Sequence, residues 1–443
     1  MSEHKEEDRQ QKKGISKKES LAILAASMLA ALSAFLVTVI AKHNLESLDN
    51  SQFLIFWSLL FGVYGVVAGL QQESTRAVGA ARLQTRLTDA GLGRPGAPVI
   101  AIAAAFGLVI GLLVLLTSPW WAPGQFHSQV YFSAALIGCS VPLYAVHAAM
   151  SGAAAGREKW YQFALLGGAE ASWRLLAILL AALFAVGLAG FQLAVVSAVF
   201  FWMVLLLCSR QARITFTARA DVGSARLSRN ILFAMGSSAA SAVLMTGFPA
   251  LMRASEGGQL SERASIELAL MILAISICRS PIMIPLQAFQ GFAISAFLKQ
   301  KHRPVAAMVK PAAALMGVGL LGALLAGLVG PWLFRLIYPP KPNEVEVYDQ
   351  VLSGWLLGLL VLASAVMALL VLSGTAVIAL NAHRAYVAGW TLAALVSLAL
   401  LFLPLDLVSR SVLALFVGPG CGFGVHLTAM LLYARRSLAD PNP

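Results

Sequence analysis

The chain has 443 residues, of which 59% are hydrophobic and only 12% are charged. A soluble globular domain carries about 25% charged residues, so this composition excludes a soluble enzyme or binding domain and requires an apolar solvent around most of the chain. The formal net charge of +12 does not indicate nucleic acid as a partner, because the cytoplasmic loops of membrane proteins carry the basic excess.

The predicted elements are membrane-spanning helices. Residues 1–19 are polar and are expected to form a disordered cytoplasmic tail, since they have almost nothing to bury. The rest predicts an all-α polytopic protein with about 12 transmembrane helices, each of about 20 mostly apolar residues. These spans are expected at 20–42, 52–75, 97–118, 128–152, 161–187, 190–208, 228–250, 265–297, 306–330, 350–373, 375–402 and 408–434. Near the tenth span, Asn381, His383 and Arg384 favour an end close to Leu380.

A basic stretch at 209–227 divides the spans into two six-helix bundles, at 20–208 and 228–436, and we interpret it as a cytoplasmic linker. Residues 437–443 are expected to form a cytoplasmic tail. With the amino terminus placed in the cytoplasm, most of the 32 basic residues fall on cytoplasmic segments. The sequence therefore predicts a multi-pass protein of the bacterial cytoplasmic (inner) membrane with both termini inside.

Nothing in the sequence has the pattern of an enzyme, a cofactor site or a metal site. The four cysteines lie in separate apolar runs, without metal-binding spacing. The glycine-rich stretch 418–424 lacks the Lys-Ser/Thr of a phosphate loop, and close helix packing explains it better. We expect a transporter that needs no cofactor other than a coupling ion, Na⁺ or H⁺, or the membrane potential.

Arg279 is the sharpest candidate for function. It lies about 20 Å along its span, where a charge is costly and normally faces protein or water. Pro281 and Pro285 follow it and predict a kink or hinge. Two interpretations stay open, an anion site in a central cavity or a structural partner for backbone carbonyls or a remote acid.

Two further groups of charges lie in spans. Glu170 and Arg174 share one helix face at i, i+4 and form either a structural ion pair or a site for coupling or substrate. Gln72, Glu73 and Arg76 lie near the cytoplasmic boundary of the second span. They are either interfacial residues or an entry site for a phosphate.

These segments together resemble the flippases of the multidrug/oligosaccharidyl-lipid/polysaccharide (MOP) superfamily, including Wzx-type exporters. Gly152–Arg174 resembles the family's connection between helices 4 and 5, and 72–76 resembles its second helix. Arg279-Ser280-Pro281 with Leu286-Gln287-Ala288-Phe289-Gln290 resembles its eighth helix. The first span, from Leu21 to Ala41, contains no charge, unlike that of lipid II flippases, which also have two extra helices.

The resemblance implies a MATE-like fold and export of a polyprenyl-phosphate- or pyrophosphate-linked sugar to the outer leaflet, for cell-envelope polysaccharide synthesis. The implied partners are that lipid, membrane lipids and envelope glycosyltransferases. The implied substrate-binding residues are Arg279, Arg76, Gln72, Gln287 and Gln290, with Glu170, Arg174 and Glu73 as a coupling or structural ion pair. The alternatives are an ion-coupled multidrug or metabolite exporter and a non-transporting scaffold for envelope enzymes. A major-facilitator transporter is disfavoured, because residues 79–86 lack the expected loop motif.

Overall fold

The structure is a computed structural model that describes residues 16–87, 96–299, 304–380 and 382–439. Apart from one isolated bridge between Pro98 and Arg219, the regular elements of this described part are helices. Eleven of them are long and apolar enough to cross a membrane, or twelve if one bent pair counts as a single span. The prediction of an all-helical polytopic membrane protein with about 12 spans is confirmed.

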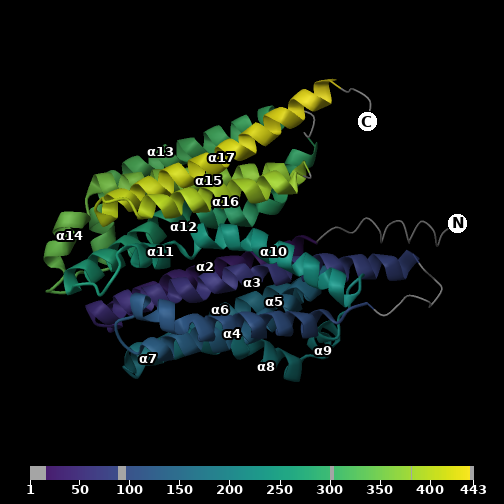
Figure 1. The fold of residues 1–443 in the computed structure, drawn as a ribbon, viewed down its shortest axis with the longest axis horizontal. Helices are drawn as coiled ribbons and strands as arrows, with labels where there is room; N and C mark the ends of the chain where they lie inside the picture. Colours follow the sequence, from purple (N-terminus) through teal and green to yellow (C-terminus); the bar gives the residue numbers. More distant parts are fainter. Residues whose placement is uncertain (1–15, 88–95, 300–303, 381, 440–443) are drawn as a thin grey trace.

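The first group of helices comprises α2 to α9 and lies in the lower half of Figure 1. Its sixth span is broken into α7, a short 3-10 turn and α8, and α9 occupies part of the stretch expected to be a linker. The members are α2 (Lys17–Asn44), α3 (Ser47–Leu87), α4 (Val99–Gln125), α5 (Val130–Gly156), α6 (Trp160–Leu183), α7 (Gly187–Ser197), α8 (Phe201–Cys208) and α9 (Arg210–Phe216).

The second group comprises α10 to α17 and lies in the upper half of Figure 1. Its members are α10 (Ser224–Met245), α11 (Phe248–Ser255), α12 (Glu262–Lys299), α13 (Pro304–Ile337), α14 (Val345–Val351), α15 (Gly354–Ala379), α16 (His383–Leu401) and α17 (Leu407–Ala439). The expected boundary at 373–375 is wrong. Helix α15 ends at Ala379, next to the alternative position at Leu380, because the apolar run continues to that point.

The expected single span 228–250 is instead a bent pair, since α10 and α11 meet at 66°. Gly247 is the N-cap of α11 and Pro249 follows at its start, where a proline without an N–H cannot continue the ladder of α10. Ser58 of α3 satisfies two of the freed backbone groups. Its hydroxyl donates to Thr246 O (2.6 Å) and accepts from the Ala250 N–H (3.3 Å).

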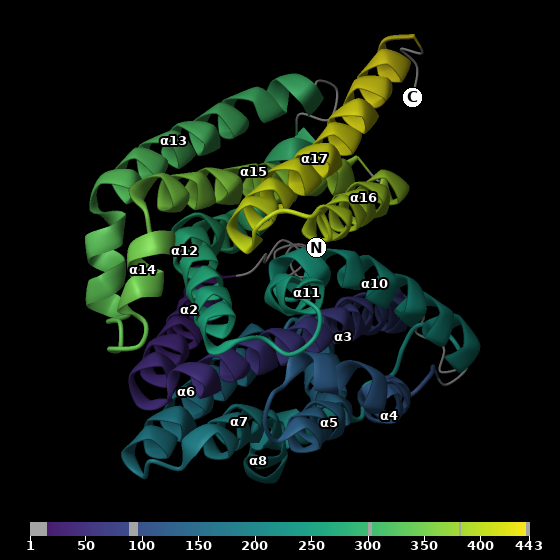
Figure 2. The same ribbon diagram turned by 60° about the vertical axis from the view of Figure 1, so that its left-hand side comes forward.

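The two groups meet along a close contact between α3 and α10, which lie side by side in Figures 1 and 2. Two glycines of α3 permit it. A Cβ at Gly65 would lie 2.6 Å from the Cβ of Ala242, and one at Gly69 would lie 2.4 Å from the Met235 nitrogen. We call Gly65 and Gly69 the glycine seam, because only residues without a side chain allow the two backbones to approach so closely.

The start of α2 and the end of α17 lie at one end of the molecule and α14 lies at the other (Figure 1). We call these the inner end and the outer end. The distribution of basic residues predicts that the inner end is cytoplasmic. Helix α3 runs the full length between them, from Ser47 at the outer end to Leu87 at the inner end. Gln72 therefore lies about 37 Å from the outer end of this helix.

Candidate functional site

A cavity of about 1090 Å³ lies between the two groups of helices toward the inner end. Helix α3 contributes the three residues predicted from its sequence, Gln72, Glu73 and Arg76. Helices α10 and α16 contribute polar residues that sequence reasoning did not assign to a site, namely Asn230, Ser237, His383, Arg384 and Thr391. The cavity is thus built from both halves of the chain, with polar and apolar side chains on its walls.

Arg76 is balanced by two carboxylates. Its guanidinium bonds Glu73 Oε1 at 2.7 Å and Asp221 Oδ2 at 3.1 Å, and Glu73 also accepts from the Asn230 amide at 3.0 Å. The Arg76 side chain is nevertheless 45% exposed, so it retains access to the cavity. Glu73 is therefore part of a local ion-pair network of α3, and Arg76 adds donors to the cavity without adding net positive charge.

Arg384 supplies the uncompensated charge of this cavity. It is exposed and forms no ion pair within the described residues, and the exposed His383 precedes it. Both lie at the start of α16, directly after a short connection from α15. In the sequence, His383 and Arg384 form a polar interruption between two spans, a pattern that predicts a turn but not a binding site. Two adjacent basic residues beside a cavity can bind an anion.

Arg279 contacts backbone carbonyls at the break between α10 and α11. Its Nη1 donates to Leu244 O (3.1 Å) and Met245 O (3.0 Å), while its Nε has no hydrogen-bond partner. Arg279 is not among the described residues that line the inner cavity. This geometry corresponds to the carbonyl-partner interpretation, and an anion-binding role for Arg279 stays a prediction. Gln287 and Gln290 lie on α12, but their side chains are outside the described residues.

An apolar groove of about 400 Å³ lies between α12, α13 and α15, and Arg279 is not among the described residues that line it. Cys278 and Pro281 of α12 form one wall, and α13 and α15 form the others. Apart from the Cys278 thiol, every lining side chain is a hydrocarbon or glycine, and the opposite wall includes Gly322, Leu325 and Leu357. Pro281 and Pro285, the expected hinge residues, both lie inside the continuous helix α12.

A buried ionic cluster lies inside the first group of helices. Glu170 forms an ion pair with Arg174 on the same helix, and His147 Nε2 of α5 lies 3.1 Å from Glu170 Oε2. All three side chains are less than 10% exposed. The Arg174 guanidinium also lies over the Phe61 ring, 4.9 Å from its centroid. The i, i+4 spacing predicted the Glu170–Arg174 pair, but no sequence signal connected His147 to it.

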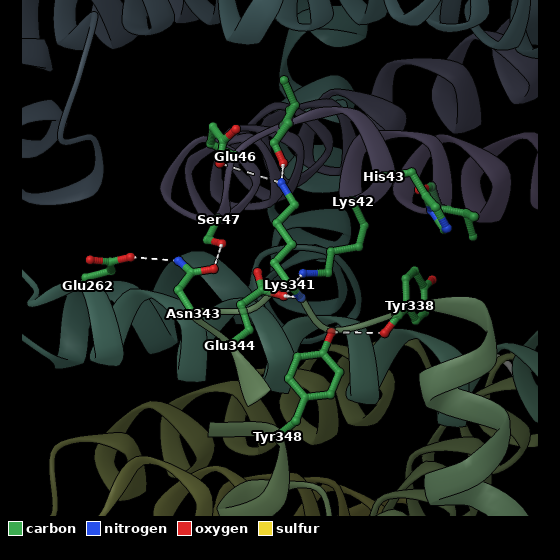
Figure 3. A network of polar contacts seen from close by, with 12 residues as sticks. Lys42, His43, Glu46, Ser47, Glu262, Tyr338, Lys341, Asn343, Glu344 and Tyr348 are labelled. Carbon is green, nitrogen blue, oxygen red and sulfur yellow. Dashed lines mark hydrogen bonds and ion pairs between the residues drawn. The ribbon is translucent and has the colours of Figure 1, made fainter. Parts of the chain in front are cut away.

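A polar network joins the two groups at the outer end (Figure 3). Lys42 of α2 and Glu344, just before α14, form an ion pair in which both side chains are buried. Lys341 donates to Leu45 O, and Asn343 Oδ1 accepts from the Ser47 hydroxyl at 3.4 Å. These partners lie on the connection between α13 and α14, residues 338–344, so this connection closes the outer end against α2 and the start of α3.

The solved structures similar to this chain are transporters. An inward-facing multidrug resistance MATE family transporter of the MOP superfamily matches with a TM-score of 0.70 and 12% identity, over 95% of this chain and 98% of that one. A MOP superfamily transporter from Pyrococcus furiosus matches with a TM-score of 0.65 and 12% identity, over 96% of each chain. The chain therefore has the MATE-like fold of MOP superfamily transporters.

The curated relatives are mycobacterial proteins. The uncharacterized protein Rv1510 of Mycobacterium tuberculosis (strain ATCC 25618 / H37Rv) is 32% identical over 406 residues, which cover 92% of this chain and 90% of the relative. The uncharacterized protein Mb3654 of Mycobacterium bovis (strain ATCC BAA-935 / AF2122/97) is 33% identical over 407 residues, covering 91% and 90%. This chain belongs to the family of these proteins. No model of a protein family matches it.

Proposed function

We propose that the protein is a transporter that flips a polyprenyl-phosphate- or pyrophosphate-linked sugar to the outer leaflet by alternating access, for cell-envelope polysaccharide synthesis. The observation that carries the proposal is the contrast between the two ends. A cavity of about 1090 Å³ separates the halves toward the inner end, while buried contacts join them at the outer end. This arrangement is that of a carrier whose site faces one side of the membrane at a time.

The chemistry of the inner cavity suits a phosphate-linked sugar. Its volume is slightly above the range of about 300–1,000 Å³ typical of small-molecule sites. Arg384 and the exposed edge of Arg76 offer guanidinium donors, which bind phosphate oxygens well. Gln72, Asn230 and Thr391 offer amides and a hydroxyl to sugar hydroxyl groups. The headgroup would therefore cross between the halves, screened from the bilayer.

The lipid tail needs no polar path, because it is as apolar as the bilayer. The groove between α12, α13 and α15 offers it a hydrocarbon-lined position against the helix that carries Arg279. In the present state Arg279 bonds the carbonyls of Leu244 and Met245. We propose that movement about the Pro281–Pro285 segment exchanges these carbonyls for the substrate phosphate. On this proposal, Arg279 bonds backbone carbonyls in one state of the transport cycle and binds the anionic substrate in another.

The buried cluster of Glu170, Arg174 and His147 is the proposed coupling site. Both carboxylate oxygens of Glu170 are already in contact with cationic or protonatable groups. A metal cation such as Na⁺ prefers oxygen ligands and is repelled by the neighbouring guanidinium, by analogy with other hard cations. We therefore propose H⁺ as the coupling ion. Proton exchange between Glu170 and His147 would change how tightly α5 and α6 are held together.

The test is accumulation of lipid-linked sugars on each face of the membrane in cells depleted of the protein. We expect the substrate to accumulate on the cytoplasmic face. Wild type should clear it, whereas Arg279→Ala and Arg384→Ala should not. Lys310→Ala is the matched control, because Lys310 is an exposed basic residue that does not line the cavity.

Other outcomes favour the alternatives. If no lipid accumulates and the depleted cells become sensitive to toxic organic cations, the protein is a multidrug or metabolite exporter. If a lipid accumulates but both arginine variants clear it completely, the proposed substrate-binding residues are wrong. If no transport defect of either kind is found, the protein is better explained as a non-transporting scaffold for envelope enzymes.

A further inference from the structure

His426 of α17 is completely buried in the second group of helices, and both of its ring nitrogens have hydrogen-bond partners. Nδ1 lies 2.9 Å from the hydroxyl of Ser373 on α15, and Nε2 lies 3.2 Å from the carbonyl oxygen of Tyr386 on α16. His147 differs, since its Nδ1 has no partner. The His426 imidazole thus joins α15, α16 and α17, and the half-buried Tyr386 of α16 is the titratable side chain stacked against it among the described residues.

The hydrogen bonds around His426 can accommodate one extra proton without losing a partner. In the neutral ring, Nε2–H donates to Tyr386 O and Nδ1 accepts from the Ser373 hydroxyl. In the doubly protonated ring, Nδ1–H donates to the Ser373 oxygen. The Ser373 hydroxyl then turns to Leu370 O, which lies 3.0 Å away. A buried polar group that loses its partners is costly, and here each protonation state keeps them all, so the remaining cost of protonation is that of the charge itself.

The ring is also held in place by glycines. A Cβ at Gly389 of α16 would lie 2.3 Å from His426 Nε2, and one at Gly374 of α15 would lie 3.3 Å from its Cε1. The imidazole therefore rests directly against the backbones of two neighbouring helices. A larger residue at Gly389 would displace it from the Tyr386 carbonyl.

The inner cavity approaches this site on one side. The Tyr386 side chain lines the inner cavity, and its ring is stacked on that of His426 with 6.1 Å between centroids. The other titratable groups of the described residues on α13, α16 and the inner part of α17 lie at exposed or half-exposed positions, namely Lys310, Arg335, His383, Arg384, Cys421, Tyr433 and Arg435. No carboxylate lies among them to neutralise a charged imidazole.

We propose that His426 is a reversible proton-binding site, loaded from the inner cavity past Tyr386. A charged imidazole without a counter-ion is disfavoured in apolar surroundings, so the proton binds more tightly when α16 moves and water reaches the ring. A proton can shift a conformational equilibrium only through such a difference in affinity. Protonation of His426 therefore favours displacement of α16 from α15 and α17. This inference does not depend on the substrate of the transporter.

The experiment is ¹⁵N NMR of histidine-labelled protein in lipid bilayers, from about pH 8 to about pH 5, where histidine ordinarily titrates. The chain has seven histidines, so the spectrum of His426→Gln is subtracted to isolate the signal of His426. A glutamine can accept from Ser373 and donate to Tyr386 O, and thermal unfolding at about pH 8 checks that the variant is folded. His383→Gln is the control for an exposed histidine of α16.

We expect the difference signal to change reversibly from a neutral to a doubly protonated imidazole. A cysteine at Thr391, which lines the inner cavity, reports the movement of α16. When His426 is present, the labelling rate of this cysteine should differ about fivefold or more between pH ~8 and pH ~5, since fivefold is the lower end of typical coupling between linked sites. When His426→Gln is added, the labelling rate should be the same at both pH values. A signal that stays neutral at about pH 5, or a labelling response that survives His426→Gln, would overturn the proposal.

Discussion

Lys42 and Glu344 are 302 positions apart in the chain, and they form an ion pair in which each side chain is only 3% exposed. The Lys341 backbone N–H also donates to Glu344 at 2.9 Å, and the Lys42 ammonium lies 5.6 Å from the centre of the Tyr348 ring. A buried charge is stable only while its partners remain in place. This pair therefore links the positions of the two halves at the outer end.

Loss of one partner should open the outer end. We expect Lys42→Ala to destabilise the closed state by about 3–5 kcal/mol, the typical cost of leaving one buried charge unpaired. The measurement is the labelling rate of a cysteine at Thr38, which is buried beside Tyr338 in the closed state. The double variant Lys42→Glu with Glu344→Lys, which exchanges the two charges, should partly restore the slow labelling of the cysteine at Thr38.

Arg335 and Asp349 provide the matched control at the same end. They form an ion pair at 2.7 Å, but their side chains are 40% and 57% exposed. Exposed pairs contribute about 0–1 kcal/mol, so Arg335→Ala should leave labelling at Thr38→Cys almost unchanged. Equal effects of Lys42→Ala and Arg335→Ala would show that the Lys42–Glu344 pair does not hold the outer end closed.

The closed outer end should also depend on pH through Glu344. Burial raises the pKa of this carboxyl group, but the Lys341 N–H and the Lys42 ammonium outweigh burial and hold the pKa below its usual range. A lowered pKa means that the pair contributes fully above the ordinary value of about 4.3 and is lost as pH falls through the lowered value. The labelling rate at Thr38→Cys should therefore increase as the pH falls below about 4. Glu344→Gln should abolish this dependence.

The buried cluster of α5 and α6 should behave as a unit. Glu170→Gln leaves Arg174 and His147 without a carboxylate and should lower the free energy of unfolding by about 3–5 kcal/mol. The double variant Glu170→Gln with Arg174→Met should recover part of this loss, since it removes both charges. Thermal unfolding in detergent measures both effects.

Glu158 is the control for that cluster, because it is 60% exposed in its pair with Arg82. Glu158→Gln should change stability by about 0–1 kcal/mol. If Glu170→Gln were no more destabilising than Glu158→Gln, the ionic cluster would not support the first group of helices.

The glycine seam should tolerate no side chain. A Cβ at Gly69 would lie 2.4 Å from the Met235 nitrogen, so Gly69→Leu must separate α3 from α10. We expect a loss of at least about 1–3 kcal/mol, the usual cost of overpacking, seen as a lower unfolding temperature and a lower yield of folded protein. Gly317→Leu is the control, because a Cβ there meets no atom within 4 Å. Similar unfolding temperatures for the two variants would show that the packing of α3 against α10 does not require a glycine at position 69.

The sequence predicts the spans well because hydropathy depends on local composition. It predicts the Glu170–Arg174 pair for the same reason, since i, i+4 spacing is local. The sequence does not predict the break between α10 and α11, although Gly247 and Pro249 lie at it, because the apolar run continues across them. A window of mean hydropathy cannot distinguish a straight helix from two short ones.

Contacts between distant segments could not be predicted from one sequence. His147 reaches Glu170 only because α5 packs against α6, and Lys42 reaches Glu344 only because the halves close at the outer end. Arg279 could be placed in a span, but its carbonyl partners exist only because α10 ends where it does. In each case the missing information is tertiary packing rather than residue chemistry.

The connection between α13 and α14 has a pharmacological consequence. Pro339, Pro340 and Pro342 restrict its backbone, and its partners lie on α2 and at the start of α3. If the outer end faces away from the cytoplasm, as the basic residues predict, an antibody fragment or cyclic peptide could reach this connection without entering the cell. A binder that holds this connection against α2 would keep the transporter in the state with the outer end closed. Such an inhibitor would not need to compete with the substrate.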